Sequence, residues 1–296
     1  MHRKGKKSRI VFAAVLLLFL QQSAAYGVAP WKWRMSLIGE AATNRILRPS
    51  AIYIDGASER YYVVDTGNNR LMSFARDGSF LNAFNAQDSL KTPVDFSKDK
   101  SGMLWVIEKG RNSLTRINLK SKQVTPHILK YQDRIVYPER FEHVGDLFYV
   151  LDKASGMIIS YNWKLQPVKT YSCSDCSGGF IDFTVHNGRI WGLSYREKVV
   201  YGFEPLGKIK QKILLDQGAI DFPRSLAFDK SGMLYLLDRK QAQIVVFDQK
   251  GRLKFRFLGP GHVREKLYYP MEIQFDPWGN LCVVDEGNGR VEIYSR

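Results

Sequence analysis

The most constraining feature of this sequence is a hairpin-like stretch that occurs twice, near opposite ends of the chain. Residues 61–74 read YYVVDTGNNRLMSF, and residues 281–294 read LCVVDEGNGRVEIY. Each copy has an apolar run, an Asp, a turn containing Gly and Asn, an Arg, and a second β-rich run. Turn residues between two β-branched or aromatic runs are typical of a β-hairpin. Because the hairpin recurs, the fold is to be sought in a repeat.

Two further markers share one period of 42 to 47 residues. The first opens each unit: Pro49, Pro93, Pro138, Phe180, Pro223 and Pro270. The second closes the strongest strand-like run of each unit: Asp65, Glu108, Asp152, Ser194, Asp238 and Asp285. Two markers that keep the same spacing predict six repeats.

Each unit contains four short strand-like runs, and the fifth unit shows them best, at 224–229, 233–238, 243–248 and 253–258. Gly-containing turns separate them, and no long apolar pattern with a period of 3.6 residues follows residue 25. Four strands in about 44 residues is the size of a propeller blade. The sequence therefore predicts an all-β, six-bladed β-propeller with four antiparallel strands per blade.

The sixth unit ends at Arg296 after only three strand-like runs. Residues 34–39 (RMSLIG) are similar to 255–259 (FRFLG), the fourth run of unit five. We therefore expect residues 31–39 to complete the last blade and close the ring. The predicted blades lie near 47–89, 90–134, 135–177, 178–219, 220–266 and 267–296, the last together with 31–39.

The first 25 residues have the composition of a signal peptide. A basic segment at 1–9 precedes the apolar run 10–20, and small residues follow at 23–25. This pattern predicts cleavage after Ala25, a propeller domain at 26–296, and export to the periplasm or the cell exterior. An uncleaved signal anchor is the alternative. After cleavage the chain is not expected to be transmembrane.

The net charge is +15, and the first 25 residues contain five basic residues and no acidic one. The rest of the chain has 39 basic and 29 acidic residues, which favours acidic partners. An acidic protein, an anionic envelope polymer or anionic lipid headgroups would satisfy this preference. RNA is not expected as a partner of an exported protein. We expect a monomeric propeller.

The repeat resembles the NHL-repeat propellers. Its pattern is Pro-x-x-apolar-x-apolar-Asp, then Gly-x-apolar-Tyr/Trp-Val-x-Asp, then Asn-Asn-Arg-apolar. Residues 65–70 (DTGNNR), 223–238 and 285–290 (DEGNGR) match it best, whereas unit four lacks both the Pro and the Asp. The resemblance covers nearly all of the chain after residue 25. It implies a fold but no single function, since NHL propellers serve as enzymes, RNA binders and protein-binding sensors.

In a propeller the innermost strand of each blade lines a central channel, so the residues just after each unit-opening residue should surround its mouth. The candidate site residues there are Asp95, Glu139, Arg140, Asp182, Arg224 and Glu272. The four acids could hold a divalent cation through oxygen ligands. We favour the alternative, in which they pair with Arg140 and Arg224 across the channel. No cofactor is predicted, and a divalent cation is left open.

The repeated hairpin turns form a second candidate set on the face that carries this mouth. Its members are Asp65, Asn68, Asn69, Arg70, Asp285, Asn288 and Arg290. An Asp that accepts backbone amides can fix a turn, and an Arg can bridge to a neighbouring segment. For these residues we favour a structural role over ligand binding.

Cysteine and histidine chemistry is weakly supported. Cys173 and Cys176 can close a local disulfide in an oxidising compartment, and Cys282 lies in an apolar run typical of the core. Some NHL propellers are amidating lyases with a zinc ion held by three His. Here His127, His143, His186 and His262 are expected on different parts of the ring, so a zinc site is disfavoured.

Two functional hypotheses follow. The first is a non-enzymatic, exported binding or scaffold module that holds a protein or envelope polymer on one face. The alternative is a hydrolase or lyase with a divalent metal at the channel mouth.

Overall fold

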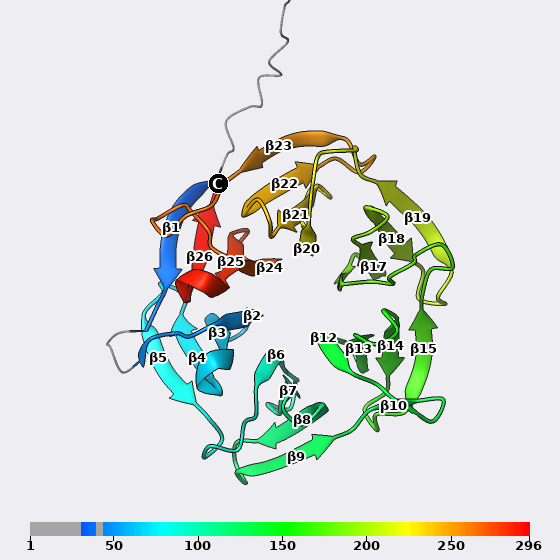
Figure 1. The fold of residues 1–296 in the computed structure, drawn as a ribbon. Helices are drawn as coiled ribbons and strands as arrows, with labels where there is room; N and C mark the ends of the chain where they lie inside the picture. Colours follow the sequence, from blue (N-terminus) through cyan, green and yellow to red (C-terminus); the bar gives the residue numbers. More distant parts are fainter. Residues whose placement is uncertain (1–30, 40–43) are drawn as a thin grey trace, which may run out of the picture.

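The chain forms a ring of six four-stranded antiparallel sheets, the six-bladed β-propeller that the repeat predicted (Figure 1). The computed structural model describes residues 31–39 and 44–296. The predicted signal peptide, residues 1–25, lies outside the described residues. Within the described ranges, no helix is both long and apolar enough to cross a membrane.

Five blades are continuous in sequence. Blade 1 contains β2 (Pro49–Asp55), β3 (Arg60–Asp65), β4 (Arg70–Ala75) and β5 (Phe80–Phe84); blade 2 contains β6 (Pro93–Lys98), β7 (Leu104–Glu108), β8 (Ser113–Asn118) and β9 (Gln123–His127). Blade 3 contains β12 (Pro138–Val144), β13 (Leu147–Asp152), β14 (Ile158–Tyr161) and β15 (Pro167–Tyr171); blade 4 contains β16 (Asp182–His186), β17 (Arg189–Ser194), β18 (Val199–Phe203) and β19 (Ile209–Leu214). Blade 5 contains β20 (Pro223–Phe228), β21 (Leu234–Asp238), β22 (Gln243–Phe247) and β23 (Leu253–Phe257). A small hairpin, β10 (Lys130–Tyr131) with β11 (Arg134–Ile135), joins blades 2 and 3.

Blade 6 joins the two ends of the chain. It contains β24 (Pro270–Phe275), β25 (Leu281–Asp285), β26 (Arg290–Ser295) and the N-terminal strand β1 (Lys32–Leu37), which pairs antiparallel with β26 (Figure 1). The predicted closing strand is therefore confirmed. Closure covers the edge of β26 that a three-stranded blade would leave unpaired.

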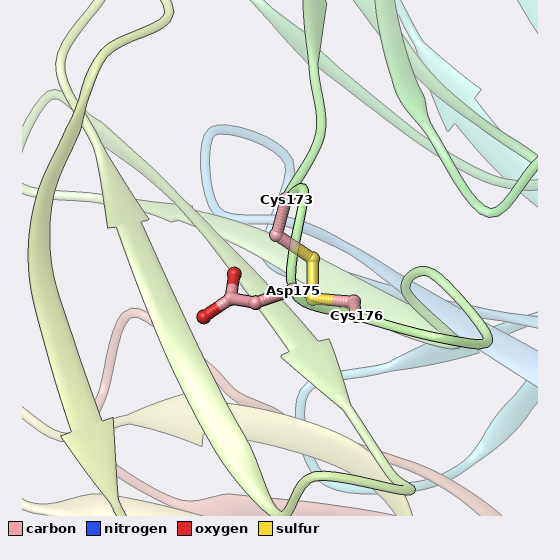
Figure 2. Close-up of side chains that lie close together, drawn as sticks. All are labelled: Cys173, Asp175 and Cys176. Atoms are coloured by element: carbon pink, nitrogen blue, oxygen red, sulfur yellow. A yellow bond between two sulfur atoms is a disulfide. The ribbon is translucent and has the colours of Figure 1, made fainter.

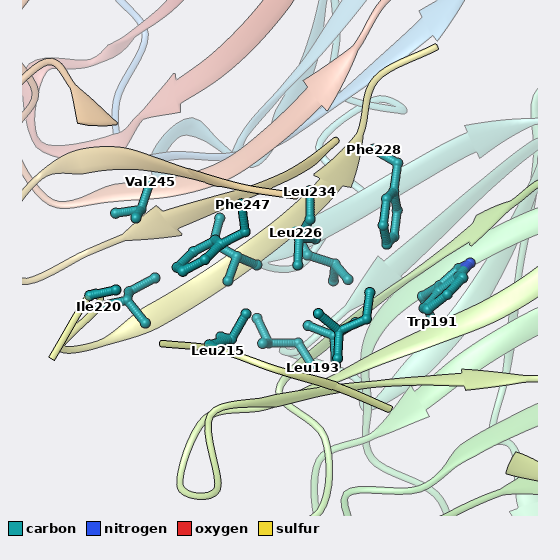
Figure 3. Close-up of a cluster of buried hydrophobic side chains, with 13 residues drawn as sticks. Trp191, Leu193, Leu215, Ile220, Leu226, Phe228, Leu234, Val245 and Phe247 are labelled. Atoms are coloured by element: carbon teal, nitrogen blue, oxygen red, sulfur yellow. The ribbon is translucent and has the colours of Figure 1, made fainter. Parts of the chain in front are cut away.

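The apolar cores lie between neighbouring blades, because a blade has two apolar faces and can bury them only on its neighbours. Between blades 4 and 5, Trp191 and Leu193 of β17 belong to one buried cluster with Leu226, Leu236 and further residues of blade 5 (Figure 3). Equivalent clusters occur between other pairs, including blades 6 and 1. Burying one such leucine contributes about 1.5–3 kcal/mol.

The second marker of the repeat has a physical role. The residue that ends the second strand is a buried carboxylate in five blades, and it accepts a backbone amide from the segment that leads into the first strand of its own blade. Oδ1 of Asp65 accepts the amide of Leu47 at 2.7 Å, and Oδ1 of Asp285 accepts that of Tyr268 at 2.7 Å. In blade 4, Ser194 replaces the carboxylate and its hydroxyl donates to Glu197 instead.

In five blades the first strand carries a β-bulge just after the opening proline. In blades 1, 2, 3, 5 and 6, the residue after the opening Pro has no partner on the second strand. A bulge re-aims a side chain at the point where the ladder is disrupted. The five bulged residues are Ser50, Val94, Glu139, Arg224 and Met271, and all five line the channel mouth.

The loop between β15 and β16 contains a disulfide between Cys173 and Cys176. The carboxylate of Asp175 lies beside it but points away from the sulfur atoms, and it pairs with Nζ of Lys212 at 2.6 Å (Figure 2). Because the sulfur atoms are bonded to each other and the carboxylate has its own partner, these three residues do not form a metal site. Cys282 is a buried free thiol in the core between blades 6 and 1.

Ring closure can be tested on two adjacent residues of the closing segment. Leu37 is fully buried in the core between blades 6 and 1, whereas Ile38 is more than half exposed. We expect Leu37→Ala to lower the free energy of unfolding by about 2–5 kcal/mol, because it leaves a cavity at the closure. Ile38→Ala should change it by less than about 0.5 kcal/mol. Urea unfolding of the two variants checks this, and equal effects would contradict a latched ring.

Candidate functional site

The six predicted channel-mouth residues do lie together at one end of the axis. The face that carries this mouth and the loops between second and third strands is called the top face below. At the mouth, Glu139, Arg140, Asp182, Arg224 and Glu272 line a hollow of about 40 Å³. Asp95 lies beside them, with Oδ2 3.7 Å from the nearer Arg140 nitrogen. A hollow of this volume has room for a water molecule but not for an organic substrate.

Arg140 is the centre of this arrangement. It is largely buried, with 14% of its side chain exposed, and its guanidinium approaches Glu272 Oε1 at 2.6 Å and Asp182 Oδ1 at 3.0 Å. The contact between Arg140 Nε and Asp182 Oδ1 is an ion pair, but the N–H group does not point at the oxygen well enough to form a hydrogen bond. The expectation that these acids pair with arginine therefore agrees with the geometry. Glu139 pairs with Lys109 at 2.9 Å, and Arg224 lies 3.7 Å from it.

The axial carboxylates also join neighbouring blades. Each follows its blade-opening residue by two positions and accepts the amide of a first strand in the next blade. Asp95 accepts from Phe141 at 2.9 Å, Asp182 from Leu226 at 3.0 Å, and Glu272 from Ile52 at 3.0 Å. Ser225, at the equivalent position of blade 5, accepts from Ile273 at 3.2 Å. These bonds cross four of the six junctions between neighbouring blades.

A divalent cation does not fit among these carboxylates as they stand. The Arg140 guanidinium occupies the space between Asp182 and Glu272 that a shared cation would need. Oxygens of Asp95, Asp182 and Glu272 are already engaged by backbone amides. A cation would have to displace Arg140 from a buried site, leaving its charge unpaired at a cost of several kcal/mol.

Burial raises the pKa values of several axial acids. Burial raises the pKa of Glu272 to about 7 even though Arg140 lowers it, and the pKa of Asp95 is raised for the same reason. Glu142, whose Oε2 accepts the amide of Val185 at 2.9 Å, also has its pKa raised to about 7 by burial. Glu139 differs: burial raises its pKa, but its Lys109 partner and nearby cations outweigh this and hold the pKa below the ordinary value.

The predicted hairpin-turn residues are engaged with one another and with nearby backbone groups. Asp65 binds Nε of Arg70 at 2.6 Å and Nδ2 of Asn68 at 2.9 Å. Asp285 binds Arg290 and Asn288 in the same way, and Asn69 Oδ1 accepts the Thr92 amide at 2.7 Å. The remaining donors of Arg70 and Arg290 reach backbone carbonyls of the preceding loop. This geometry supports the structural role that we favoured for them.

Asn68 and Asn288 also line a larger cleft on the top face, of about 730 Å³. The cleft lies where blades 5, 6 and 1 meet, and it contains the arginines Arg45, Arg48 and Arg239. One carboxylate in its lining opposes them, Glu286, which lies 2.9 Å from Arg239 and 3.7 Å from Arg48. We call this the top-face cleft. Its excess of guanidinium groups suits an anionic ligand.

Exposed aromatic side chains surround the channel mouth, and the sequence analysis did not select them. Tyr137, Phe222 and Tyr269 are 42–54% exposed, and each immediately precedes the proline that opens a blade. The buried carboxylates of the second strands hold the backbones of Tyr137 and Phe222, as in Tyr137 N to Asp152 Oδ1 at 2.8 Å, and that of Tyr268 beside Tyr269. The signal that could have revealed them is positional: the residue before each repeat-opening Pro projects from the top face.

The histidines do not converge. His143 and His186 lie near the ends of first strands, at the face opposite the channel mouth, stacked on Phe148 and Phe228. His127 is the last residue of β9, the fourth strand of its blade. His262 lies on the top face, with Nδ1 2.7 Å from Asn288 Oδ1. The described histidines therefore form no zinc site.

Comparisons with known proteins agree on the fold. No protein-family model and no curated protein sequence matches the chain. Among solved structures, it is similar to a gluconolactonase from Xanthomonas campestris, with 13% identity, a TM-score of 0.66, and 88% of each chain covered. It is also similar to virginiamycin B lyase from Staphylococcus aureus, with 14% identity, a TM-score of 0.62, and 90% and 89% covered. At these identities the similarity establishes the propeller fold alone.

Removal of the axial arginine should destabilise the ring. We expect Arg140→Met to lower the free energy of unfolding by about 3–5 kcal/mol, because it leaves buried carboxylates without their counter-charge. Arg224→Met, near the same mouth but 3.7 Å from its acidic partner, should cost less than about 1 kcal/mol. Denaturant unfolding measures both. An Arg140→Met protein as stable as the parent would show that the ion cluster is not structural.

The raised axial pKa values predict the sign of a pH effect. Folding raises the pKa of Glu142 from 4.5 to about 7, so the folded chain binds more protons in this range. Stability from this group is present below about pH 4.5 and is lost as the pH rises through about 7. In the parent protein, Glu142 should therefore lower Tm by on the order of 5 °C between pH 5 and pH 8. The Glu142→Gln variant should not show this part of the fall. Glu139→Gln is the control: its pKa is lowered, so it should not remove the fall.

Proposed function

We propose that this protein is an exported, NHL-type binding propeller that holds an acidic protein or envelope polymer on its top face and does not itself catalyse a reaction. The observation that carries this proposal is the rim of exposed aromatic side chains and arginines around a closed channel mouth. Tyr137, Phe222 and Tyr269 supply the aromatic groups, and Arg48 and Arg239 supply cations beside Tyr269.

Aromatic and arginine side chains have the chemistry of binding hot spots. Tyr and Arg are enriched in protein interfaces, where a few such anchors carry most of the binding energy. On this rim Arg239 lies over the ring of Tyr269, with 5.9 Å between its guanidinium carbon and the ring centroid. The stacked pair keeps both groups in a defined position, which reduces the entropy lost on binding.

The charge of the top face determines the class of partner. The loops between second and third strands carry seven basic residues and two acidic ones: Lys109, Arg111, Lys153, Arg196, Lys198, Arg239 and Lys240 against Glu197 and Glu286. A surface with this excess attracts anions over a distance of about 10 Å at moderate ionic strength. An acidic partner fits it, and export would place that partner in the envelope or outside the cell.

The axis supports binding rather than chemistry. Its acids are engaged by Arg140 and by backbone amides, and the hollow at the mouth is too small for an organic substrate. The acids that a metal-dependent enzyme would use are thus committed to joining blades.

The proposal predicts loss of polyanion binding when the rim is altered. With polygalacturonate as the probe at low salt, the double variant Arg48→Gln/Arg239→Gln should bind about tenfold more weakly. The matched control is Lys100→Gln/Lys230→Gln, which removes two exposed lysines from turns of identical sequence on the opposite face. Titration of each protein by isothermal calorimetry measures the difference. No binding by the parent, or an equal loss in the control, would overturn the top-face assignment.

A hydrolase or lyase with a metal at the channel mouth is the second candidate, favoured by the gluconolactonase and the virginiamycin B lyase that share the fold. Metal analysis of gently purified protein separates it from the first. A stoichiometric divalent metal that is lost in Asp182→Ala or Glu272→Ala would support the enzyme. Absence of metal, with no change in Tm on adding a chelator, would support the binding module.

A further inference from the structure

Three adjacent turns on the face opposite the channel mouth carry large apolar side chains in open solvent. They are the turns between the third and fourth strands of blades 2, 3 and 4, and their exposed residues are Leu119, Trp163 and Leu206. These side chains are 49–74% exposed. Trp163 and Leu206 are among the most exposed large apolar residues of the described chain. We call this set the apolar arc.

The arc is confined to these three blades. In blade 1 the equivalent turn reads Arg76-Asp77-Gly78, and in blade 5 it reads Asp248-Gln249-Lys250, so both neighbours have polar tips. Figure 1 shows β9, β15 and β19, which follow the three turns, in succession along one side of the rim. Because the turns leave their blades toward the same face, one flat surface can meet all three tips.

Lysines flank every tip, and the three turns contain a single acid, Glu204. The segments 119–122, 163–170 and 206–214 contain seven lysines and neither Asp nor Glu: Lys120, Lys122, Lys164, Lys169, Lys208, Lys210 and Lys212. Two of these, Lys210 and Lys212, pair with acids outside the segments. The other five have no ion-pair partner within residues 31–39 and 44–296. The arc therefore consists of apolar side chains with positively charged side chains beside them.

The turns are held in shape before any partner arrives. Asn118 Oδ1 accepts the amides of Lys120 and Ser121, and Asn162 Oδ1 accepts those of Lys164 and Gln166. The turn of blade 4 is tied to blade 3 by the Tyr171 hydroxyl, which donates to the Pro205 carbonyl at 3.0 Å. The tips thus project from a fixed frame, which limits the entropy cost of docking.

A cleft of about 520 Å³ between blades 2 and 3 reaches the tip of Trp163. Its lining includes the cations Lys100 and Arg116, neither of which has an ion-pair partner among the described residues, and the carboxylates Asp99 and Asp146. The Asp99 oxygens accept from Ser101 and Trp105. The cleft therefore places two cations and two carboxylates beside the exposed indole.

We infer that the apolar arc docks on the surface of a membrane rich in anionic phospholipid, independently of the top face. Indole rings prefer the interface between headgroups and acyl chains, where their apolar body and polar N–H are both accommodated. Leucines beside them add buried apolar area, and lysines gain from the negative surface potential while their stems lie along the apolar layer. The occupant is a bilayer rather than a protein, because the three tips lie on three different blades and one flat layer can meet all of them.

Protection of strand edges accounts for only part of this pattern. Lysines on exposed outer strands discourage edge-to-edge pairing, which would explain Lys169, Lys210 and Lys212. It does not explain exposed leucine and tryptophan at the turns, because such side chains promote association rather than prevent it.

Vesicle flotation tests the inference. The chain from residue 26 is used, because the apolar run at 10–20 would bind lipid by itself, and every strand of the ring lies after residue 30. The probe is a phosphatidylcholine vesicle with about 30% phosphatidylglycerol. Lys120→Gln/Lys164→Gln/Lys208→Gln should lower the partition coefficient about 100-fold, at roughly fivefold for each lysine. Leu119→Ser/Trp163→Ser/Leu206→Ser should abolish binding.

The controls separate this surface from the top face. Tyr137→Ser/Tyr269→Ser, which removes two exposed aromatic groups from the opposite face, should leave flotation unchanged. Brominated lipid should quench tryptophan emission in the parent and quench less in Trp163→Phe, a readout that a folding defect would not reproduce. No flotation of the parent, equal binding to pure phosphatidylcholine, or full binding by the serine variant would each overturn the inference. Polygalacturonate binding by that variant should stay intact.

Discussion

The ring depends on hydrogen bonds that cross from blade to blade near its axis. Asp95, Asp182, Ser225 and Glu272 occupy the same position in four blades, and each accepts an amide from the first strand of the next blade. Apolar packing between blades is non-directional, so it cannot by itself set their angular register. A short polar contact at fixed positions can. The same repetition concentrates negative charge on the axis. The positive charge of the Arg140 guanidinium balances part of it.

A second set of buried carboxylates connects the fold to the surface. In five blades the residue that ends the second strand holds the segment leading into its own blade, and that segment presents the residue before the blade-opening proline. Tyr137 and Phe222 are exposed for this reason: their backbones are fixed by Asp152 and Asp238 while their side chains project from the top face. Anchoring of the backbone and exposure of these aromatic side chains are thus two consequences of one repeated interaction.

The two faces of the ring differ in chemistry although the blades repeat. On the top face, exposed aromatic groups of three blades and the arginines of the top-face cleft lie near a closed mouth. On the opposite face, apolar tips occur on blades 2 to 4 only, with lysines around them. Residues in the turns are free to diverge, since turns contribute little to the cores between blades, and their differences give each face its own surface chemistry.

The sequence alone determined the architecture, because a hairpin motif with a constant period dictates how many blades form and which strand must come from the other end of the chain. The expected pairs at the channel mouth also followed from repeat position. Only the tertiary structure decided that Arg140, and no other cation, lies between Asp182 and Glu272, since this depends on distances across the ring. It alone showed which turns present Tyr137, Trp163 or Leu206 to solvent, because exposure is a property of neighbouring blades and not of any one repeat.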